Sequence, residues 1–225
     1  MLLFREKDIA LFDRNNKEIK HIYEVAESKH FQRFNDVIAD QNGNIFAGVM
    51  SETDINGGFY LLKDGFEIAK LVGDSQISNG FAFNKSNTSL YWVNTSKKII
   101  YKFDYDHKTS QISNQKEFYS YTDQLCDPDG IATDQDNNLF VAKWEGAGID
   151  VINSRGVLID KIDLPVKKIS SMTFGGQSLD TLYITSAGGT GSPSEALDGS
   201  IFCVKTDYKG KLEFRSKIGF VNPSS

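Results

Sequence analysis

Small polar side chains recur at one position of a repeated segment. Asn35, Asn79, Asp129 and Ser170 each open a similar stretch of sequence, and they are called the lead residues below. Amide and carboxylate oxygens are the ligands that hard cations such as Ca²⁺ prefer. Asn79 and Asp129 are each followed by glycine, and such pairs are also common in tight turns, because these residue types tolerate a left-handed backbone. The pattern leaves both interpretations open, a tight turn or a set of metal ligands.

An arginine stands two residues before the first lead residue. The guanidinium of Arg33 has the fork geometry that binds a carboxylate or a polarised oxygen, and the alternative is a surface arginine in a loop. No Gly-x-Ser-x-Gly elbow occurs, so the sequence does not support serine-hydrolase chemistry. Cys126 and Cys203 show no metal-ligand spacing and are interpreted as reduced thiols of a cytosolic protein.

The elements that position these residues are predicted to be short strands. Each lead residue begins a segment that passes through a polar turn into an apolar strand; these strands are Ile45-Phe-Ala-Gly, Leu90-Tyr-Trp-Val, Leu139-Phe-Val-Ala and Leu182-Tyr-Ile-Thr. The lead residues are 44, 50 and 41 positions apart, and a period of roughly 40–50 residues built of strands is typical of a β-propeller. Equivalent positions of successive blades circle one axis. We therefore expect Asn35, Asn79 and Asp129 to face one another across a central channel.

Apolar hairpins with Asp, Asn and Gly turns alternate with these inner strand pairs. Five outer hairpins but only four inner pairs can be counted, and the chain begins directly with a hairpin. The sequence therefore predicts an all-β chain, residues 1–225, forming a single propeller domain of about four and a half blades. A propeller avoids exposed edges by closing its ring, so we expect an N-terminal portion to be missing and edges to be exposed.

Composition excludes several classes of partner. The 225 residues carry 25 basic and 30 acidic side chains, a formal net charge of −5, which argues against nucleic acid and anionic membranes as partners. No stretch approaches the roughly 18 apolar residues of a membrane helix. The first residues break their apolar run with charge, unlike a signal peptide. A soluble cytoplasmic protein is expected.

Five motifs carry a resemblance to a known family. They are Arg33-Phe-Asn-Asp, Ser78-Asn-Gly-Phe, Pro128-Asp-Gly-Ile-Ala-Thr-Asp, Leu139-Phe-Val-Ala-Lys-Trp and Phe174-Gly-Gly-Gln-Ser-Leu-Asp-Thr-Leu-Tyr-Ile-Thr-Ser-Ala. Across roughly residues 9 to 210 the chain resembles the family of senescence marker protein (regucalcin), gluconolactonase and luciferin-regenerating enzyme. The resemblance implies a six-bladed propeller that holds one divalent cation, often Ca²⁺, and opens lactones to hydroxy acids.

The same resemblance assigns roles to individual residues. It implies that Asn79 and Asp129 are metal ligands, that Asp129 is also the catalytic base, and that Arg33 and Asn35 hold the substrate. Oxygen ligands favour Ca²⁺, with Zn²⁺ as the alternative. The family's further glutamate ligand lies in an early Glu-Gly-Pro-like motif that the 225 residues do not contain. We therefore expect weak metal binding by this chain.

Two functions from different classes follow. The first is a metal-dependent lactonase that opens a sugar or related lactone, impaired by the absent glutamate, with the small-molecule lactone as its partner. The second is a non-catalytic propeller, or a remnant of one, that binds a small ligand or a protein partner. Hydrolysis of lactones with metal added and then chelated distinguishes them. The sequence identifies neither the lactone nor the oligomeric state.

Overall fold

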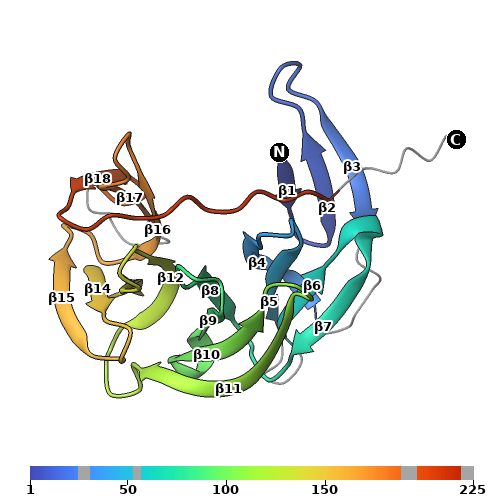
Figure 1. Ribbon diagram of the computed structural model, residues 1–225. Coiled ribbons are helices and arrows are strands. Elements are labelled where there is room, and N and C mark those ends of the chain that lie inside the picture. The colour runs from blue at the N-terminus through green and yellow to red at the C-terminus, as the bar shows by residue number, and fades with distance from the viewer. Residues whose placement is uncertain (25–30, 53–56, 189–196, 219–225) are drawn as a thin grey trace, which may run out of the picture. The chain divides into compact units, whose positions relative to one another are not determined.

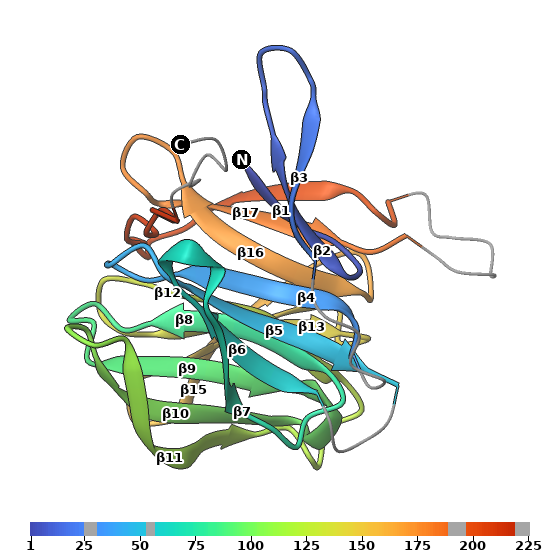
Figure 2. The same ribbon diagram turned by 90° about the vertical axis from the view of Figure 1, so that its right-hand side faces the viewer.

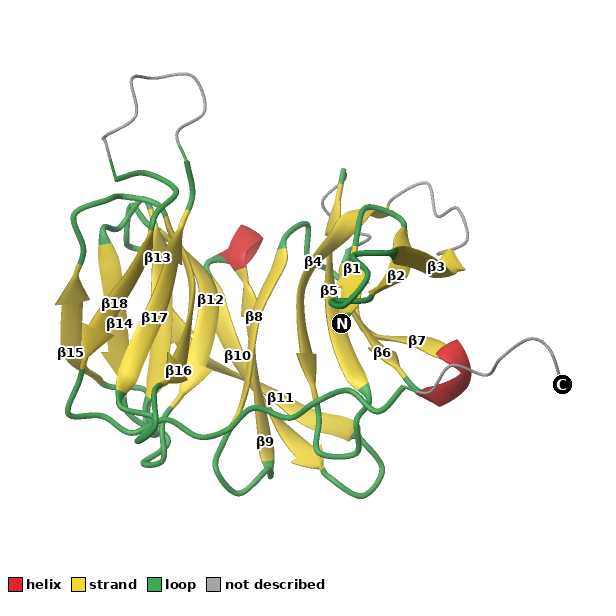
Figure 3. Cartoon of the chain, turned by 90° about the horizontal axis from the view of Figure 1, so that it is seen from above, coloured by secondary structure: helices red, strands yellow, loops and turns green. Residues whose placement is uncertain are grey.

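The structure is a computed structural model, and it describes residues 1–24, 31–52, 57–188 and 197–218. These residues form 18 strands and two 3₁₀ turns, η1 (Asp64–Phe66) and η2 (Thr95–Lys97). Figure 3 colours the strands yellow and the helical turns red. None of the described helices is long and apolar enough to cross a membrane. The strands form five antiparallel sheets in chain order, the blades of an all-β β-propeller.

Two compact units can be distinguished in the chain. The first comprises Met1–Asn79 together with the C-terminal segment that begins at Phe214. It contains a three-stranded sheet and a four-stranded sheet, whose strands lie side by side in sequence order (Figure 2). These strands are β1 (Leu2–Phe4), β2 (Asp8–Phe12), β3 (Ile19–Glu24), β4 (Phe31–Ala39), β5 (Ile45–Ser51), β6 (Gly58–Leu62) and β7 (Ile68–Val72).

The second unit, Gly80–Glu213, contains three sheets, except that Ser78 and Asn79, the first two residues of their first strand, belong to the first unit. Two of them have four strands and the third has three, again in sequence order (Figure 1). Their strands are β8 (Ser78–Phe83), β9 (Ser89–Asn94), β10 (Ile99–Asp106), β11 (Gln111–Ser120), β12 (Asp127–Thr133), β13 (Leu139–Trp144), β14 (Gly148–Ile152), β15 (Leu158–Asp163), β16 (Ile169–Gly175), β17 (Thr181–Ser186) and β18 (Ile201–Lys205).

Apolar strands fold into this arrangement because neighbouring sheets pack face to face. Within the second unit, Phe140 of one sheet lies in the same buried cluster as Met172, Phe174 and Leu182 of the next. Every residue of β9 is buried, including Trp92. The aromatic residues of β9, Tyr91 and Trp92, therefore form core and not an exposed stacking surface.

The last sheet differs from the other two sheets of its unit. Its residues Met172, Leu182 and Ile184 are buried, but Tyr183 and Ile201, which alternate with them or lie beside them, are 42% and 72% exposed. Among the described residues, β18 pairs with β17 alone. One face and one edge of this sheet are thus open to solvent in the part of the chain that is described.

Most local expectations are met. The polar runs that begin at Asp40 and Asp134 are turns between the first two strands of a sheet, as predicted, and each aspartate accepts two backbone hydrogen bonds at 2.7–2.9 Å. The segment from Ile19 to Glu24 forms β3, and residues 25–30 lie outside the described part. The sequence predicts about four and a half blades, and the described residues form five, two of which have three strands.

The C-terminal segment packs onto the first unit. Ile218 is buried in the same cluster as Ile9 and Phe34. The backbone N–H of Lys217 donates to the carbonyl of Gly43 at 3.0 Å. Gly43 has a φ of +91°, and a Cβ there would lie 2.6 Å from the Lys217 nitrogen, so both conformation and space require glycine at this turn.

Candidate functional site

Three of the four lead residues, Asn35, Asp129 and Ser170, lie at irregularities in the first strands of their sheets. In β4, a bulge places Asn35 and Asp36 opposite a single residue of β5. In β12, a second bulge places Asp129 and Gly130 opposite a single residue of β13, and β16 has a register shift at Ser170. Bulges interrupt strand pairing and redirect side chains, and they are frequent beside active sites. The repeated sequence position is thus a repeated structural feature, which pattern reading missed.

Three of the four sequence-predicted site residues form one connected chain of hydrogen bonds. The guanidinium of Arg33 donates to Asn35 Oδ1 at 2.6 Å and to the carbonyl of Phe34 at 3.0 Å. Asn35 Nδ2 in turn donates to Asn79 Oδ1 at 3.0 Å and to the Ser78 carbonyl at 3.1 Å. Asn35 and Asn79 are half-buried and Arg33 is exposed. These contacts fix the amide orientation of Asn35, because its oxygen accepts and its nitrogen donates.

Asp36 follows Asn35 in the same bulge and was not assigned a role from the sequence. Burial raises the pKa of its carboxyl to about 6, against which the hydrogen bond from the Val37 N–H acts. That bond is 2.8 Å long. In the folded chain the carboxyl of Asp36, next to Asn35 in sequence, therefore holds its proton to a higher pH than an exposed aspartate does. The only sequence signal for it was its place at the end of Arg-Phe-Asn-Asp.

Asp129 belongs to the second unit, where it is half-buried in β12. The glycine after it does not serve a turn, since neither Gly80 nor Gly130 has a positive φ. A Cβ on Gly80 would lie 2.5 Å from the Asp129 carbonyl oxygen, and a Cβ on Gly130 would lie 2.8 Å from the Ser170 carbonyl oxygen. Both glycines are required by close approach of neighbouring first strands. The tight-turn interpretation is therefore wrong at both positions.

Similarity to known proteins agrees with the resemblance that the sequence motifs carry. The family described as the SMP-30/Gluconolactonase/LRE-like region matches residues 1–188. The chain belongs to this family. The pentonolactonase XacC of Haloferax volcanii, one of its relatives, is 30% identical over 194 residues, which cover 83% of this chain and 67% of that protein.

Solved structures show the same fold. The luciferin-regenerating enzyme aligns with a TM-score of 0.86 and 27% identity over 96% of this chain and 77% of that one. A calcium-binding regucalcin of Agrobacterium tumefaciens aligns with a TM-score of 0.88 and 21% identity, covering 96% of this chain and 75% of that one. This chain thus spans only part of the length of each of these proteins.

The oxygen donors of this SMP-30/gluconolactonase-like chain decide whether it can hold a cation. Among the described residues, no group of three or more His, Cys, Asp or Glu side chains could hold a metal ion. An amide oxygen has two lone pairs, so the bond from Asn35 to Asn79 Oδ1 does not exclude a cation there. Asn79 offers an amide oxygen and Asp129 a carboxylate, and oxygen donors of these two kinds suit a hard cation such as Ca²⁺ better than Zn²⁺.

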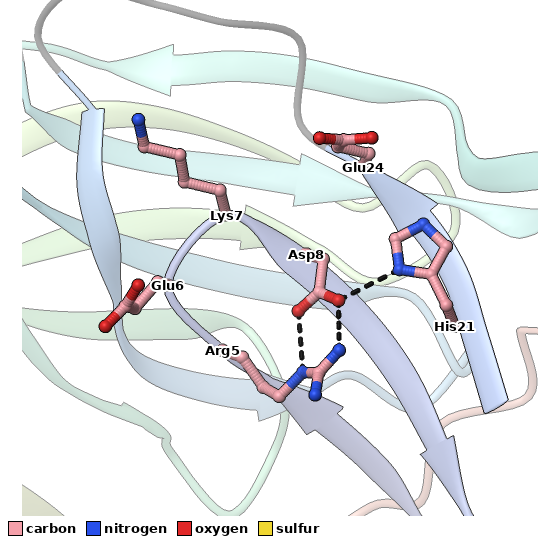
Figure 4. Close-up of a pocket in the computed structure, with 6 residues that line it drawn as sticks. All are labelled: Arg5, Glu6, Lys7, Asp8, His21 and Glu24. Carbon is pink, nitrogen blue, oxygen red and sulfur yellow. Dashed lines mark hydrogen bonds and ion pairs between the residues drawn. The ribbon is translucent and has the colours of Figure 1, made fainter. Parts of the chain in front are cut away.

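A separate hollow of about 600 Å³ lies on the first sheet and is lined by charged side chains (Figure 4). There Arg5 donates two hydrogen bonds to Asp8, and His21 Nδ1 lies 2.9 Å from Asp8 Oδ2. The hydrogen bond from Arg5, and then that from His21, lower the pKa of Asp8. None of the sequence-predicted site residues lines this hollow. Its ion pairs join β2 to β3 and to the β1–β2 turn, a structural role.

Proposed function

We propose that this chain hydrolyses a lactone with the help of a divalent cation, most simply Ca²⁺. The observation that carries the proposal is the chain of hydrogen bonds from Arg33 through Asn35 to Asn79. It connects two residues suited to holding a substrate with one suited to holding a metal. Relatives of the chain include a pentonolactonase, which supports lactone chemistry.

Each residue has a distinct task in this proposal. Arg33 and Asn35 orient the lactone, since a guanidinium and an amide offer donors to its ring and hydroxyl oxygens. Asn79 and Asp129 would hold the cation. When bound, the cation polarises the lactone carbonyl and stabilises the negative charge that develops on its oxygen.

Asp129 is proposed to move the proton. Its carboxylate accepts a proton from the attacking water, whose oxygen forms a bond to the acyl carbon. The bond between the acyl carbon and the ring oxygen then breaks, and that oxygen takes up a proton. The product is the open hydroxy acid. A general base of this kind contributes about 10²- to 10⁴-fold to the rate.

The substrate class and metal affinity follow from the same groups. Several hydrogen-bonding side chains around one carbonyl suit a sugar lactone, which carries hydroxyl groups, better than an apolar lactone. Two protein oxygens are few for Ca²⁺, which takes 6–8 oxygen ligands, so water and substrate complete the shell. Affinity depends on ligand charge, and we expect weak metal binding.

We also propose that residues 1–225 act within a single propeller domain of the six-bladed type. The support is the five blades of this chain and the extra length of its relatives, of which it covers 67–77%.

Hydrolysis of gluconolactone and a pentonolactone, followed by proton release, tests the function. We expect turnover with added Ca²⁺, loss of turnover with a chelator, and loss in Asp129→Ala. The control is Asp136→Ala, which removes a carboxylate from the turn after β12 and should keep turnover. Absence of turnover in folded, metal-saturated protein would refute the lactonase. Metal or lactone binding without turnover would then favour the non-catalytic propeller.

A further inference from the structure

The segment that leads into β12 decides where Asp129 lies. It runs from Tyr121 to Pro128, and Leu125 within it is 99% exposed. Tyr121 and Cys126 are buried in the core and anchor the segment near its two ends, whereas none of the residues 122–125 is buried. Between these anchors there is little apolar burial, so polar contacts add to what holds the segment in place.

The side chain of Lys98 supplies three of these contacts. Its ammonium donates to the carbonyls of Gln124 at 3.1 Å and Cys126 at 3.3 Å, and it lies 3.0 Å from Asp127 Oδ1. An ammonium has three protons, and here three oxygens of one short segment surround it. The side chains of Lys98 and Asp127 are 29% and 36% exposed, so solvent screens the ion pair and the carbonyl contacts carry the specificity.

A second side chain of the turn after β9, that of Thr95, also contacts this segment. The hydroxyl of Thr95, the first residue of η2, donates to the carbonyl of Pro128 at 2.8 Å. Pro128 directly precedes Asp129 and has no N–H of its own. The carbonyl of Lys98 also accepts the N–H of Tyr121 at 2.8 Å, which fixes the start of the segment. The turn after β9 thus contacts both ends of the segment.

The backbone of Lys98 is unusual for its residue type. Its φ of 56° and ψ of 36° are left-handed, a conformation that glycine adopts without cost and lysine does not. Glycine at this position would be more favourable for the backbone alone. A strained non-glycine residue is a reason to look for a function of its side chain.

We propose that Lys98 is a positioning residue for Asp129. Its ammonium, with the hydroxyl of Thr95, holds the segment from Gln124 to Pro128 and so fixes the bulge that presents the Asp129 carboxylate. This inference rests on the proposed function, in which Asp129 is both metal ligand and base. It identifies a charged side chain outside the sequence motifs as part of the site's support.

Lys98→Gly separates this role from folding. The substitution removes the ammonium but relieves the left-handed backbone, so the Tm should stay unchanged or rise. Hydrogen exchange of the amides of residues 127–131 should nevertheless become about tenfold faster, and the Kd for Ca²⁺ by calorimetry about tenfold weaker, because hydrogen bonds to a charged group are lost. Lys98→Arg should recover most of the protection, since it keeps a charged donor.

Lys17→Gly is the matched control. Lys17 also has a left-handed backbone, with a φ of 64°, but lies in the turn between β2 and β3. It should gain the same backbone relief and change neither readout. Thr95→Val should accelerate exchange at the same amides, and Lys98→Met, which keeps the stem, replaces Lys98→Gly if that variant does not fold.

The outcomes separate this inference from the proposed function. Unchanged exchange and unchanged Ca²⁺ affinity in Lys98→Gly would overturn the positioning role, whatever Asp129→Ala does. If Asp129→Ala keeps full Ca²⁺ affinity and turnover, the proposed function fails. Faster exchange in Lys98→Gly would then still establish the mechanical support of the segment.

Discussion

Gly130 offers the sharpest test of how the first strands carry the site. Replacing it by alanine would place a Cβ 2.8 Å from the Ser170 carbonyl oxygen and 2.7 Å from the Ser171 Cβ. Comfortable contacts between carbon atoms are about 3.5–4.0 Å, so β12 and β16 would have to separate by several tenths of an ångström. Overpacking of this kind costs about 1–3 kcal/mol.

Thermal unfolding followed by circular dichroism measures this loss. For a chain of this size, about 1 kcal/mol lowers Tm by roughly 2–4 °C, so Gly130→Ala should lower it by about 2–12 °C. Gly188→Ala is the control, because a Cβ there would meet no atom of the described residues within 4 Å and its φ is not positive. It should change stability by less than about 0.5 kcal/mol.

Two further variants discriminate between the explanations. Ser171→Gly removes two of the three closest atoms, the Cβ and the hydroxyl, and should restore part of the stability of Gly130→Ala. A tight turn would tolerate Gly130→Asn, because asparagine adopts left-handed conformations. Close approach predicts that asparagine is worse than alanine. Parent-like stability of Gly130→Ala, or a more stable Gly130→Asn, would refute the reasoning.

Three more predictions concern stability. The pKa of Asp36 is raised to about 6, so the folded state binds its proton more tightly than the unfolded state does, and the free energy of unfolding should fall by up to about 3 kcal/mol as pH rises from about 4 to 6. Asp36→Asn should flatten this part of the dependence of the free energy of unfolding on pH, measured by urea unfolding. An unchanged pH dependence would contradict the assignment. Lys143→Met should lower the free energy of unfolding by about 3–5 kcal/mol, because the buried Asp150 carboxylate, 2.8 Å from Lys143 Nζ, loses its countercharge. A decrease of less than about 1 kcal/mol would show that the ion pair is solvated. Gly43→Ala should loosen the C-terminal segment, seen as faster proteolysis after residue 213, and an unaltered cleavage rate would argue that the segment is held elsewhere.

Much of the fold could be predicted from the sequence, because the signals that indicate it come from residues close together in the chain. Alternating apolar strands, polar turns and a period near 45 residues need only neighbouring residues to be read. The turn at Asp40 is an example, since its carboxylate accepts the N–H groups of residues two and four positions later. Strand Ile19–Glu24 gives a weaker local signal, because none of its residues is buried.

The site was predicted less completely. Arg33, Asn35 and Asn79 were selected by position in the repeat, and the first sheets bring them into contact. The sequence did not show that Asn35 donates to Asn79, nor that Lys98 contacts the segment before Asp129. These pairs are separated by tens of residues, and no local pattern encodes which side chain a distant loop will meet.

What the sequence determined by itself is the class of the molecule. Its repeat gives a β-propeller, its motifs give the family, and its lead residues give oxygen donors in equivalent places. Only the tertiary structure decided why glycine follows Asn79 and Asp129. The cause is the neighbouring strand, which leaves no room for a Cβ, and spacing between strands of different sheets is fixed by packing and not by local sequence.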